Sequence, residues 1–459
     1  MSARDFLRKL TGNARRLAGA EHVSLAPWVD SLRHYNLGKL GLDAKAAASV
    51  TMLALPQSIA YAAIAGLPII FGILCSAVAG LVAPLFAGSR HTVLGPTNAT
   101  AFMVFSFFSV SPTLAPRAAE MVPLLVLMVG LIAAGGAILR VADLLQYVSR
   151  SVLVGYVAGA AVLIIANQLK PMLGLTPFLD DKSSASFIGL LLGLSRAILH
   201  TDWVPLMIGL STIAVYLVLL KWRPGWPGFA LTLVLSSVVF GSLIRCGVPG
   251  FAHAETFRTF QLAELSPKLP IVWHDGFFDD VAALLGVAFA IAFLASLENT
   301  LMAKTLASRT GERADVNQDM FSVGMANLAS AIAGAMPASG SLTRSMLNHD
   351  SGAVTRFSSF FTGLYTLAFA ILIAVVAEWG IRLIDFMPKA ALAGMVIVVS
   401  CSLFNLRHIK ICLRSTRDDA TVLILTFVAT ILAPLHVAIF IGVAISIALF
   451  LRKASQCDD

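Results

Sequence analysis

The sequence has 459 residues, of which 58% are apolar and only 13% are charged. Soluble globular proteins have about 45–50% apolar and about 25% charged residues, and a soluble chain this apolar would expose large apolar patches to water. The composition therefore excludes a soluble enzyme, a nucleic-acid-binding protein and a disordered protein. It predicts an all-α polytopic membrane protein. The formal net charge of +8 comes from basic residues in short loops, which we interpret as orienting the helices rather than as binding nucleic acid.

The remaining global features predict neither a secretory leader nor a metal site. The five cysteines show no CxxC or other metal-ligand spacing, so we expect free thiols, no metal and no cofactor. Residues 1–44 are polar and basic and have no cleavable apolar core. We expect them to form a cytoplasmic segment along the bilayer surface. The sequence contains no GxxxxGK[ST] phosphate loop, so nothing indicates transport driven by ATP.

Twelve apolar stretches are long enough to be membrane-spanning helices, since a bilayer core of about 30 Å needs about 20 helical residues. In the first half they are 45–66, 69–88, 121–140, 150–169, 203–222 and 226–245. In the second half they are 278–303, 319–336, 357–377, 388–404, 419–433 and 435–451. Two further apolar stretches, 96–110 and 338–349, follow prolines and are too short to span. Each of these is the third segment of its half.

The matching positions of the two interrupted segments predict internal symmetry. Short segments broken by Gly or Pro at equivalent places in two halves are typical of inverted-repeat transporters, whose substrate site lies between them. We therefore expect a 7+7 inverted repeat of 14 segments, two of them half-helices that follow short extended breaks. The predicted divisions are an N-terminal segment (1–44), a first repeat (45–245), an extracytoplasmic linker (246–277), a second repeat (278–451) and a short cytoplasmic tail (452–459).

The basic residues predict the orientation of this arrangement. With the N-terminus inside, the inside segments hold more than twice as many Lys and Arg residues as the outside segments, as the positive-inside rule requires. We therefore predict an integral protein of the cell (inner) membrane with both termini in the cytoplasm. Residues 186–200 are too short to span comfortably and end in Arg196 and His200, so we interpret them as an interfacial amphipathic helix.

Glu298 is the only acidic residue deep inside a predicted span. An ionisable group in the membrane is costly unless it faces a cavity or a partner, so its presence favours a function. The alternative is a carboxyl group that only packs against Asn299 or Thr300. As a carboxylate, Glu298 could take up a proton or, together with neighbouring hydroxyl and carbonyl oxygens, hold Na⁺.

Arg344 lies in the second interrupted segment, within PASGSLTRSMLN (337–348). A guanidinium beside a helix N-terminus is a good anion receptor, and free backbone N–H groups around Ser341 would add donors that point the same way. The alternatives are an arginine that extends to the interface or one that pairs permanently with Glu298.

Two other segments contribute uncharged polar groups to the predicted pocket. The first interrupted segment, GPTNATAFMV (95–104), offers the hydroxyl of Thr97 and the amide of Asn98. In the first span, Gln57 and Tyr61 are four residues apart and so share a helix face, just after Pro56. The alternative for Tyr61 is an aromatic residue at the membrane interface.

Five motifs in the same order resemble the SulP sulfate permeases, also known as solute carrier family 26 anion transporters. The resemblance covers nearly all of the membrane part, from about Asp43 to Arg452. The motifs are ALPQSIAYAAIAGLP (54–68), SRHTVLGPTNATAFMV (89–104), SRSVLVGYVAGAAVLIIANQL (149–169), GMANLASAIAGAMPASGSLTRSMLN (324–348) and MPKAALAGMVIV (387–398).

The resemblance implies a core domain and a gate domain, with an anion bound between the half-helix N-termini and the first and eighth segments. It also implies an elevator-like motion of the core against the gate, and a homodimer. Glu298 occupies the position that cation-coupled members use for H⁺ or Na⁺. The residues that the resemblance places around the anion are Gln57, Tyr61, Thr97, Ser341, Thr343 and Arg344, to which we add Asn98.

The family typically continues into a cytoplasmic STAS domain, whereas this sequence stops at Asp459 without one. We therefore expect regulation and part of the dimer contact to differ from those of typical members, while the transport site does not.

We predict a transporter and not an enzyme, because the sequence shows no paired carboxylates, metal cluster or nucleophile constellation. The predicted function is secondary-active symport of sulfate with H⁺ or, as a second choice, Na⁺. Bicarbonate and a dicarboxylate such as fumarate are alternative substrates, since one arginine and two helix dipoles suit them equally well. A passive anion channel and a nucleobase transporter of the same architecture are alternative functions.

Overall fold

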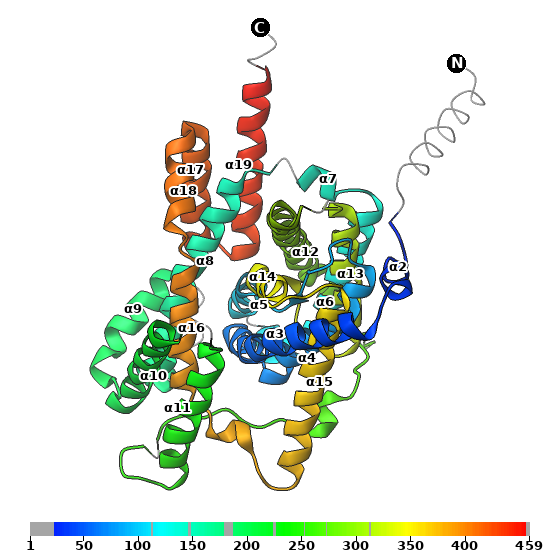
Figure 1. Cartoon of the computed structure of the whole chain (residues 1–459). Helices are drawn as coiled ribbons and strands as arrows, with labels where there is room; N and C mark the ends of the chain where they lie inside the picture. The colour runs from blue at the N-terminus through cyan, green and yellow to red at the C-terminus, as the bar shows by residue number, and fades with distance from the viewer. Residues whose placement is uncertain are drawn as a thin grey trace, which may run out of the picture.

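The computed structural model describes residues 23–111, 113–145, 148–178, 187–223, 226–251, 253–271, 273–311 and 314–455. The described chain is a bundle of helices with one short two-stranded sheet at its centre (Figure 1). Nine of the described helices are long and apolar enough to cross a bilayer.

Each half of the chain contributes seven main helices and one strand. The first half contains α3 (Leu37–Ile64), α4 (Ile69–Phe86), β1 (Leu94–Gly95), α5 (Asn98–Val110), α6 (Ala118–Ile138), α8 (Arg150–Met172), α10 (Trp203–Trp222) and α11 (Gly228–Arg245). The second half contains α12 (Phe277–Thr310), α13 (Val316–Ile332), β2 (Ser339–Gly340), α14 (Leu342–Asp350), α15 (Phe357–Glu378), α16 (Lys389–Leu403), α18 (Arg417–Leu432) and α19 (Leu435–Ser455). Shorter helices precede or connect them, namely α2 (Trp28–Arg33) before α3, and α7 (Ala142–Leu145), α9 (Phe187–Ala197) and α17 (Leu406–Ser415) between main helices.

The predicted order of segments is confirmed, and the boundaries differ at identifiable signals. Helix α3 begins at Leu37 rather than at residue 45, because the side chain of Asn36 caps its first turn by accepting from the Lys39 N–H. Helix α13 ends at Ile332 rather than at residue 336, because Gly334 adopts a positive φ of 68° that ends the helix. The surface position predicted for residues 1–22 lies outside the described residues.

The main helices form two bodies, as expected for a core domain and a gate domain. In the core, α13 packs on α6 and α4, and α15 packs on α4 and α3. In the gate, α8 packs on α18 and α16, and α10 packs on α16 and α11. The contacts of α4 with α15 and of α6 with α13 are equivalent when the two halves are exchanged, which is the inverted repeat in three dimensions. The bodies meet where α3 contacts α11 and α16, and where α12 contacts α19.

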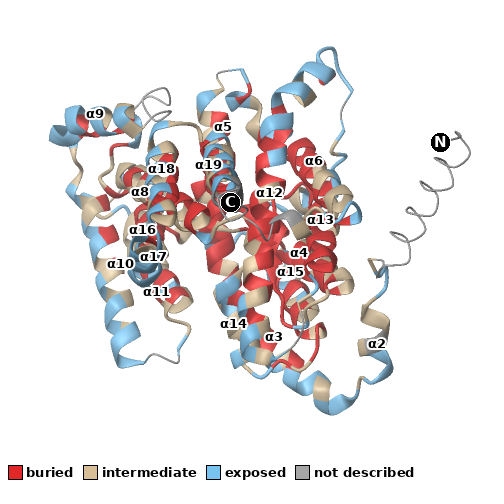
Figure 2. Ribbon diagram, turned by 90° about the horizontal axis from the view of Figure 1, so that it is seen from above, coloured by how far each residue is buried: buried red, intermediate tan, exposed pale blue. Residues whose placement is uncertain are grey.

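Burial differs strongly between the bodies (Figure 2). Buried residues are dense in the core helices α3, α4, α12 and α13, whereas few residues of α10 and α11 are buried. The exposed side chains there are apolar, for example Leu210, Leu217 and Val238. Apolar side chains on the outside of an apolar helix are expected to face lipid, so these helices form part of the membrane-facing rim.

Buried carboxylates hold two connecting loops of the core. Asp43 at the start of α3 is fully buried and accepts from the backbone N–H groups of Val354 (2.8 Å) and Thr355 (3.0 Å). Asp319 on α13 is also fully buried and accepts from the N–H groups of Gly88 (2.9 Å) and Ser89 (3.0 Å). A buried carboxylate is stabilised when it accepts several hydrogen bonds in this way.

A tyrosine completes the first of these loop contacts. The Tyr35 hydroxyl donates to Asp43 over 3.2 Å. Partial burial, and then the neighbouring Asp43 carboxylate, raise the pKa of Tyr35. The hydroxyl therefore stays protonated at neutral pH and remains a donor.

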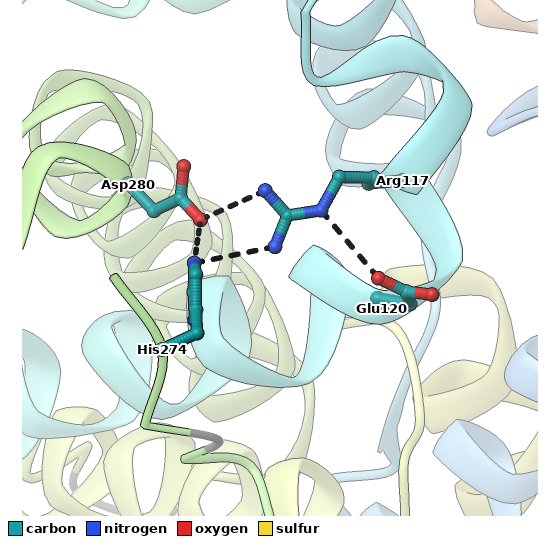
Figure 3. A network of polar contacts seen from close by, with 4 residues as sticks. All are labelled: Arg117, Glu120, His274 and Asp280. Carbon is teal, nitrogen blue, oxygen red and sulfur yellow. Dashed lines mark hydrogen bonds and ion pairs between the residues drawn. The ribbon is translucent and has the colours of Figure 1, made fainter. Parts of the chain in front are cut away.

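A polar network joins the N-terminal ends of α6 and α12 (Figure 3). Arg117 contacts Asp280 (3.2 Å) and Glu120 (3.5 Å), and His274 Nε2 lies 3.0 Å from Asp280. Asp280 is only 13% exposed, whereas Arg117 and Glu120 are considerably exposed. We expect the Arg117–Asp280 contact to position the two helix ends, because Asp280 is nearly buried and its ion pair is little screened by solvent. The more exposed Arg117–Glu120 pair should contribute little to stability.

Candidate functional site

The two predicted breaks meet at the centre of the molecule. Strands β1 and β2 pair antiparallel, with Leu94 opposite Gly340 and Gly95 opposite Ser339. Each strand leads directly into a half-helix, α5 or α14, so two helix N-termini start from the same small sheet. A helix N-terminus carries about half a positive charge from its aligned peptide dipoles. The pairing therefore concentrates positive potential at this point.

Hydroxyl side chains cap both half-helices. Thr97 accepts from the Thr100 N–H at the start of α5, and Ser341 accepts from the Arg344 N–H at the start of α14. Each cap satisfies one of the N–H groups that a helix start leaves without a partner. The remaining N–H groups of the first turns are the donors that a bound anion would use.

Glu298 connects the two breaks. One of its carboxylate oxygens accepts from Ser339 Oγ at 2.6 Å and from Thr97 Oγ1 at 3.2 Å. Ser339 belongs to β2 and Thr97 precedes α5, so the carboxylate of α12 lies between both repeats. The partly buried Glu298 carboxylate can take up a proton. Together with the hydroxyl oxygens of Ser339 and Thr97, it also offers the oxygen ligands that a small hard cation prefers.

Arg344 is fully buried beside this cluster. Its Nη2 atom donates to the Pro96 carbonyl at 2.6 Å and its Nη1 atom to Ser76 Oγ at 3.5 Å, while Nε has no hydrogen-bond partner among the described residues. No carboxylate of the described part of the chain forms an ion pair with Arg344, and Glu298 bonds instead to hydroxyls. The site therefore contains a buried positive charge without an acidic counterion.

A narrow gap lies between the core and the gate, too tight in this state to admit a water molecule. The core lines it with Gln57, Tyr61 and Asn98, and the gate lines it with Phe229, Val396 and Val399. All three core residues are at least nine-tenths buried. The side-chain oxygens of Gln57 and Asn98 have no hydrogen-bond partner among the described residues. Polar core side chains whose oxygen atoms have no hydrogen-bond partner thus face apolar gate side chains where the core and the gate meet.

A wider cavity of about 690 Å³ lies beyond this gap, and Ile64 lines both. The wider cavity is lined by the ends of α3 and α8, the start of α16 and part of the linker after α11. Its charged lining residues are Lys170, Arg258, Lys389, Glu255 and Glu264, and Lys389 pairs with Glu255 at 2.8 Å. Ile64 therefore separates a cavity with cationic groups from the central gap.

The structure brings most of the predicted site residues together, in three groups. Gln57, Tyr61 and Asn98 line the gap, Thr97 and Glu298 share a hydrogen bond, and Ser341 caps the helix that carries Arg344. Thr343 differs, because it is exposed on α14 and lines none of the described cavities.

Sequence reasoning did not single out three groups of residues at this site. Ser339 lies within PASGSLTRS, and its place just before the half-helix was a usable signal. The gate residues Phe229 and Val396 gave no signal, because they are apolar residues in apolar helices. Tyr156 on α8 is fully buried, its hydroxyl has no hydrogen-bond partner in the described structure, and it interacts electrostatically with Glu298.

Comparison with known proteins gives a consistent picture for the whole chain. Residues 40–426 match the sulfate permease family. The chain is 27% identical over 441 residues to a probable sulfate transporter of Mycobacterium tuberculosis, covering 95% of this chain and 74% of that protein. It is 26% identical over 448 residues to the chloroplastic sulfate transporter 4.1 of Arabidopsis thaliana, covering 96% of this chain and 63% of that protein. Both relatives are named as transporters and are longer than the part that this chain matches.

Solved structures show the same fold. The transmembrane domain of the cyanobacterial bicarbonate transporter BicA superposes with a TM-score of 0.75 at 20% identity, covering 88% of this chain and 98% of that domain. The murine solute carrier 26 family member A9, in its inward-facing state, superposes with a TM-score of 0.81 at 20% identity, covering 94% of this chain and 71% of that chain. Both likenesses support the 7+7 arrangement.

Proposed function

Because the chain belongs to the sulfate permease family, we propose that it is a secondary-active transporter of inorganic anions with sulfate as its main substrate. The observation that carries this proposal is the buried Arg344 without an acidic counterion, placed where two helix N-termini converge. A buried charge needs a partner of opposite sign, and an oxyanion that enters between the two half-helices as the gap widens would supply one. The amides of Gln57 and Asn98 would donate to its remaining oxygens.

The coupling ion is a proton, with Na⁺ as the second choice, and Glu298 binds it. The hydrogen bonds from Thr97 and Ser339 place the carboxylate against both half-helices. A cation on Glu298 offsets the charge of the transported anion, so both cross together at lower cost than either alone. This link explains why an acid and an arginine occupy one site without pairing.

The test is uptake into proteoliposomes. Radiolabelled sulfate, bicarbonate and fumarate are offered separately, each with an inward H⁺ gradient, an inward Na⁺ gradient or none. We expect sulfate to accumulate only with the H⁺ gradient, and vesicles without protein give the background. Accumulation of bicarbonate or fumarate instead would change the substrate, and uptake that follows the membrane potential without either gradient would favour a channel.

An elevator-type motion of the core against the gate accounts for the unequal walls of the gap. The core wall carries the polar groups and the gate wall is apolar, so the core can slide with its ligand while the gate offers no competing bonds. A disulfide between Ala60→Cys on the core and Val396→Cys on the gate, in a chain without native cysteines, should stop uptake until it is reduced. Phe229→Cys with Val399→Cys, both on the gate, is the matched control, and its uptake should be the same before and after the disulfide is reduced. Full uptake with the core–gate disulfide formed would contradict the motion.

We also propose an oligomeric state and a membrane orientation for the protein. We expect a homodimer in the cell (inner) membrane with both termini in the cytoplasm, as the distribution of Lys and Arg favours. Light scattering of the purified protein measures the assembly, and a monomeric mass would contradict the dimer. Protease accessibility of tags placed at each end in sealed vesicles measures the orientation.

A further inference from the structure

Helix α17 is a short amphipathic helix that joins the gate helices α16 and α18 (Figure 1). Its inner face packs on α18 and α8 and includes Cys412, which is 9% exposed. Leu406 and Leu413, seven residues apart, are 74% and 45% exposed on an adjoining face. Exposed leucines on a helix packed at the edge of a membrane body are expected to enter the lipid interface.

A basic face lies beside these leucines. Arg407, Lys410 and Arg414 are spaced by three and four residues, so they project from one side of the helix, and all three are exposed. None of them forms an ion pair with another described residue, and α17 contains no acidic residue. The nearest acids in sequence are engaged elsewhere, since Asp418 pairs with Arg452 at 3.3 Å and Asp419 accepts from Ser149 Oγ at 3.0 Å.

Helix α9 provides an internal comparison. It is also short, amphipathic and partly exposed, with Ile188 and Leu192 open to the surroundings. It carries a single basic residue, Arg196. The difference between the two helices is therefore the threefold charge of α17, since both have exposed apolar residues that suit an interface.

We propose that α17 binds the headgroups of anionic phospholipids and thereby anchors the gate body at the membrane surface. The three basic side chains of α17 lie on one face and can bind lipid phosphate groups. The neighbouring leucines can enter the acyl-chain region just below those phosphates. Each basic residue near an anionic membrane surface strengthens binding about fivefold. Anchoring α17 holds the connection between α16 and α18 in place while the core moves. The lipid contact itself does not depend on which anion is transported.

The experiment is hydrogen–deuterium exchange of the full chain in nanodiscs, made of phosphatidylcholine alone or mixed with phosphatidylglycerol. We expect the amides of residues 406–415 to exchange more slowly when phosphatidylglycerol is present. The triple variant Arg407→Gln, Lys410→Gln, Arg414→Gln should lose this difference, whereas Arg407→Lys with Arg414→Lys should keep it. Arg196→Gln on α9 is the matched control and should behave as the wild type.

Three outcomes would overturn the proposal. Equal exchange of 406–415 in both lipid mixtures would remove the lipid contact. Protection produced by inorganic phosphate in pure phosphatidylcholine would make a soluble oxyanion the ligand. Protection that increases with the number of protein copies per nanodisc, rather than with phosphatidylglycerol, would make a second copy of the chain the partner. Exchange elsewhere in the triple variant reports whether it is folded, so a misfolded variant is recognised, and the double lysine variant then tests the charge requirement.

Discussion

The Nη2 atom of Arg344 donates to the carbonyl oxygen of Pro96 at 2.6 Å, which ties the half-helix of the second repeat to the break in the first. The two residues are 248 positions apart in the chain. The same guanidinium thus holds the fold together and supplies the positive charge of the candidate site. These two roles can be separated by measuring stability and anion affinity on the same variants.

Arg344→Gln should lower both the free energy of unfolding and the affinity for sulfate. The buried Pro96 carbonyl loses its donor, which costs about 1–3 kcal/mol of unfolding free energy. Sulfate affinity should fall by about tenfold to a hundredfold, equivalent to about 1.4–2.8 kcal/mol. Thermal unfolding in detergent and calorimetric titration with sulfate measure the two effects.

Arg356→Gln is the control for this change. Arg356 is also buried and donates to a backbone carbonyl, that of Ala87, at 2.6 Å, but it lies away from the gap. The Arg356→Gln variant should be less stable than the wild type but should bind sulfate with unchanged affinity. Equal affinity in the two variants would show that Arg344 is structural alone.

Glu298→Gln should abolish gradient-driven accumulation and retain exchange of internal for external sulfate. A glutamine still accepts from Ser339, so the site keeps its shape, but it no longer takes up a cation. Asp319→Asn serves for comparison, since Asp319 holds the loop at Gly88 and Ser89 and should affect stability rather than coupling. Accumulation like that of the wild type in Glu298→Gln would mean that the cation binds elsewhere.

Gly95→Ala should weaken sulfate binding by displacing Arg344. A Cβ atom at this position would lie 2.5 Å from the Arg344 Nη1 atom, so the guanidinium must move and its bond to Pro96 is strained. Crowding of this kind costs about 1–3 kcal/mol of stability. Gly135→Ala meets no atom within 4 Å and should leave sulfate binding unchanged, with melting unchanged or slightly raised because Ala favours a helix more than Gly does. If the two alanine variants bind sulfate equally well, the position of the guanidinium does not matter.

Tyr156→Phe should reduce coupled uptake several-fold without loss of stability. The hydroxyl is buried without a partner among the described residues, so its removal is neutral or stabilises the fold by about 1 kcal/mol. Tyr156 belongs to the gate helix α8, and we expect its hydroxyl to bond to the Glu298 carboxylate during the transport cycle. Tyr365→Phe on α15 is the matched control. Uptake and coupling equal to those of the wild type would remove Tyr156 from the mechanism.

Much of the fold could be read from the sequence because its signals are local. A span is a continuous apolar run of a fixed length, and the two half-helices are marked by the prolines that precede them. Their equivalent positions in the two halves predict the inverted repeat without reference to any tertiary contact. Glu298 and Arg344 were recognisable because a charge within a membrane segment is costly and so seldom incidental.

The tertiary structure decided which side chains face the site. Apolar residues occur on both the lipid-facing and the protein-facing sides of these helices, so the sequence pattern does not specify how each helix is rotated about its axis. The outward position of Thr343 and the presence of Phe229 and Val396 opposite Gln57 depend on that rotation. The contact of Glu298 with Thr97 and Ser339 depends on the pairing of β1 with β2, which joins residues more than 200 positions apart and arises only when both repeats pack.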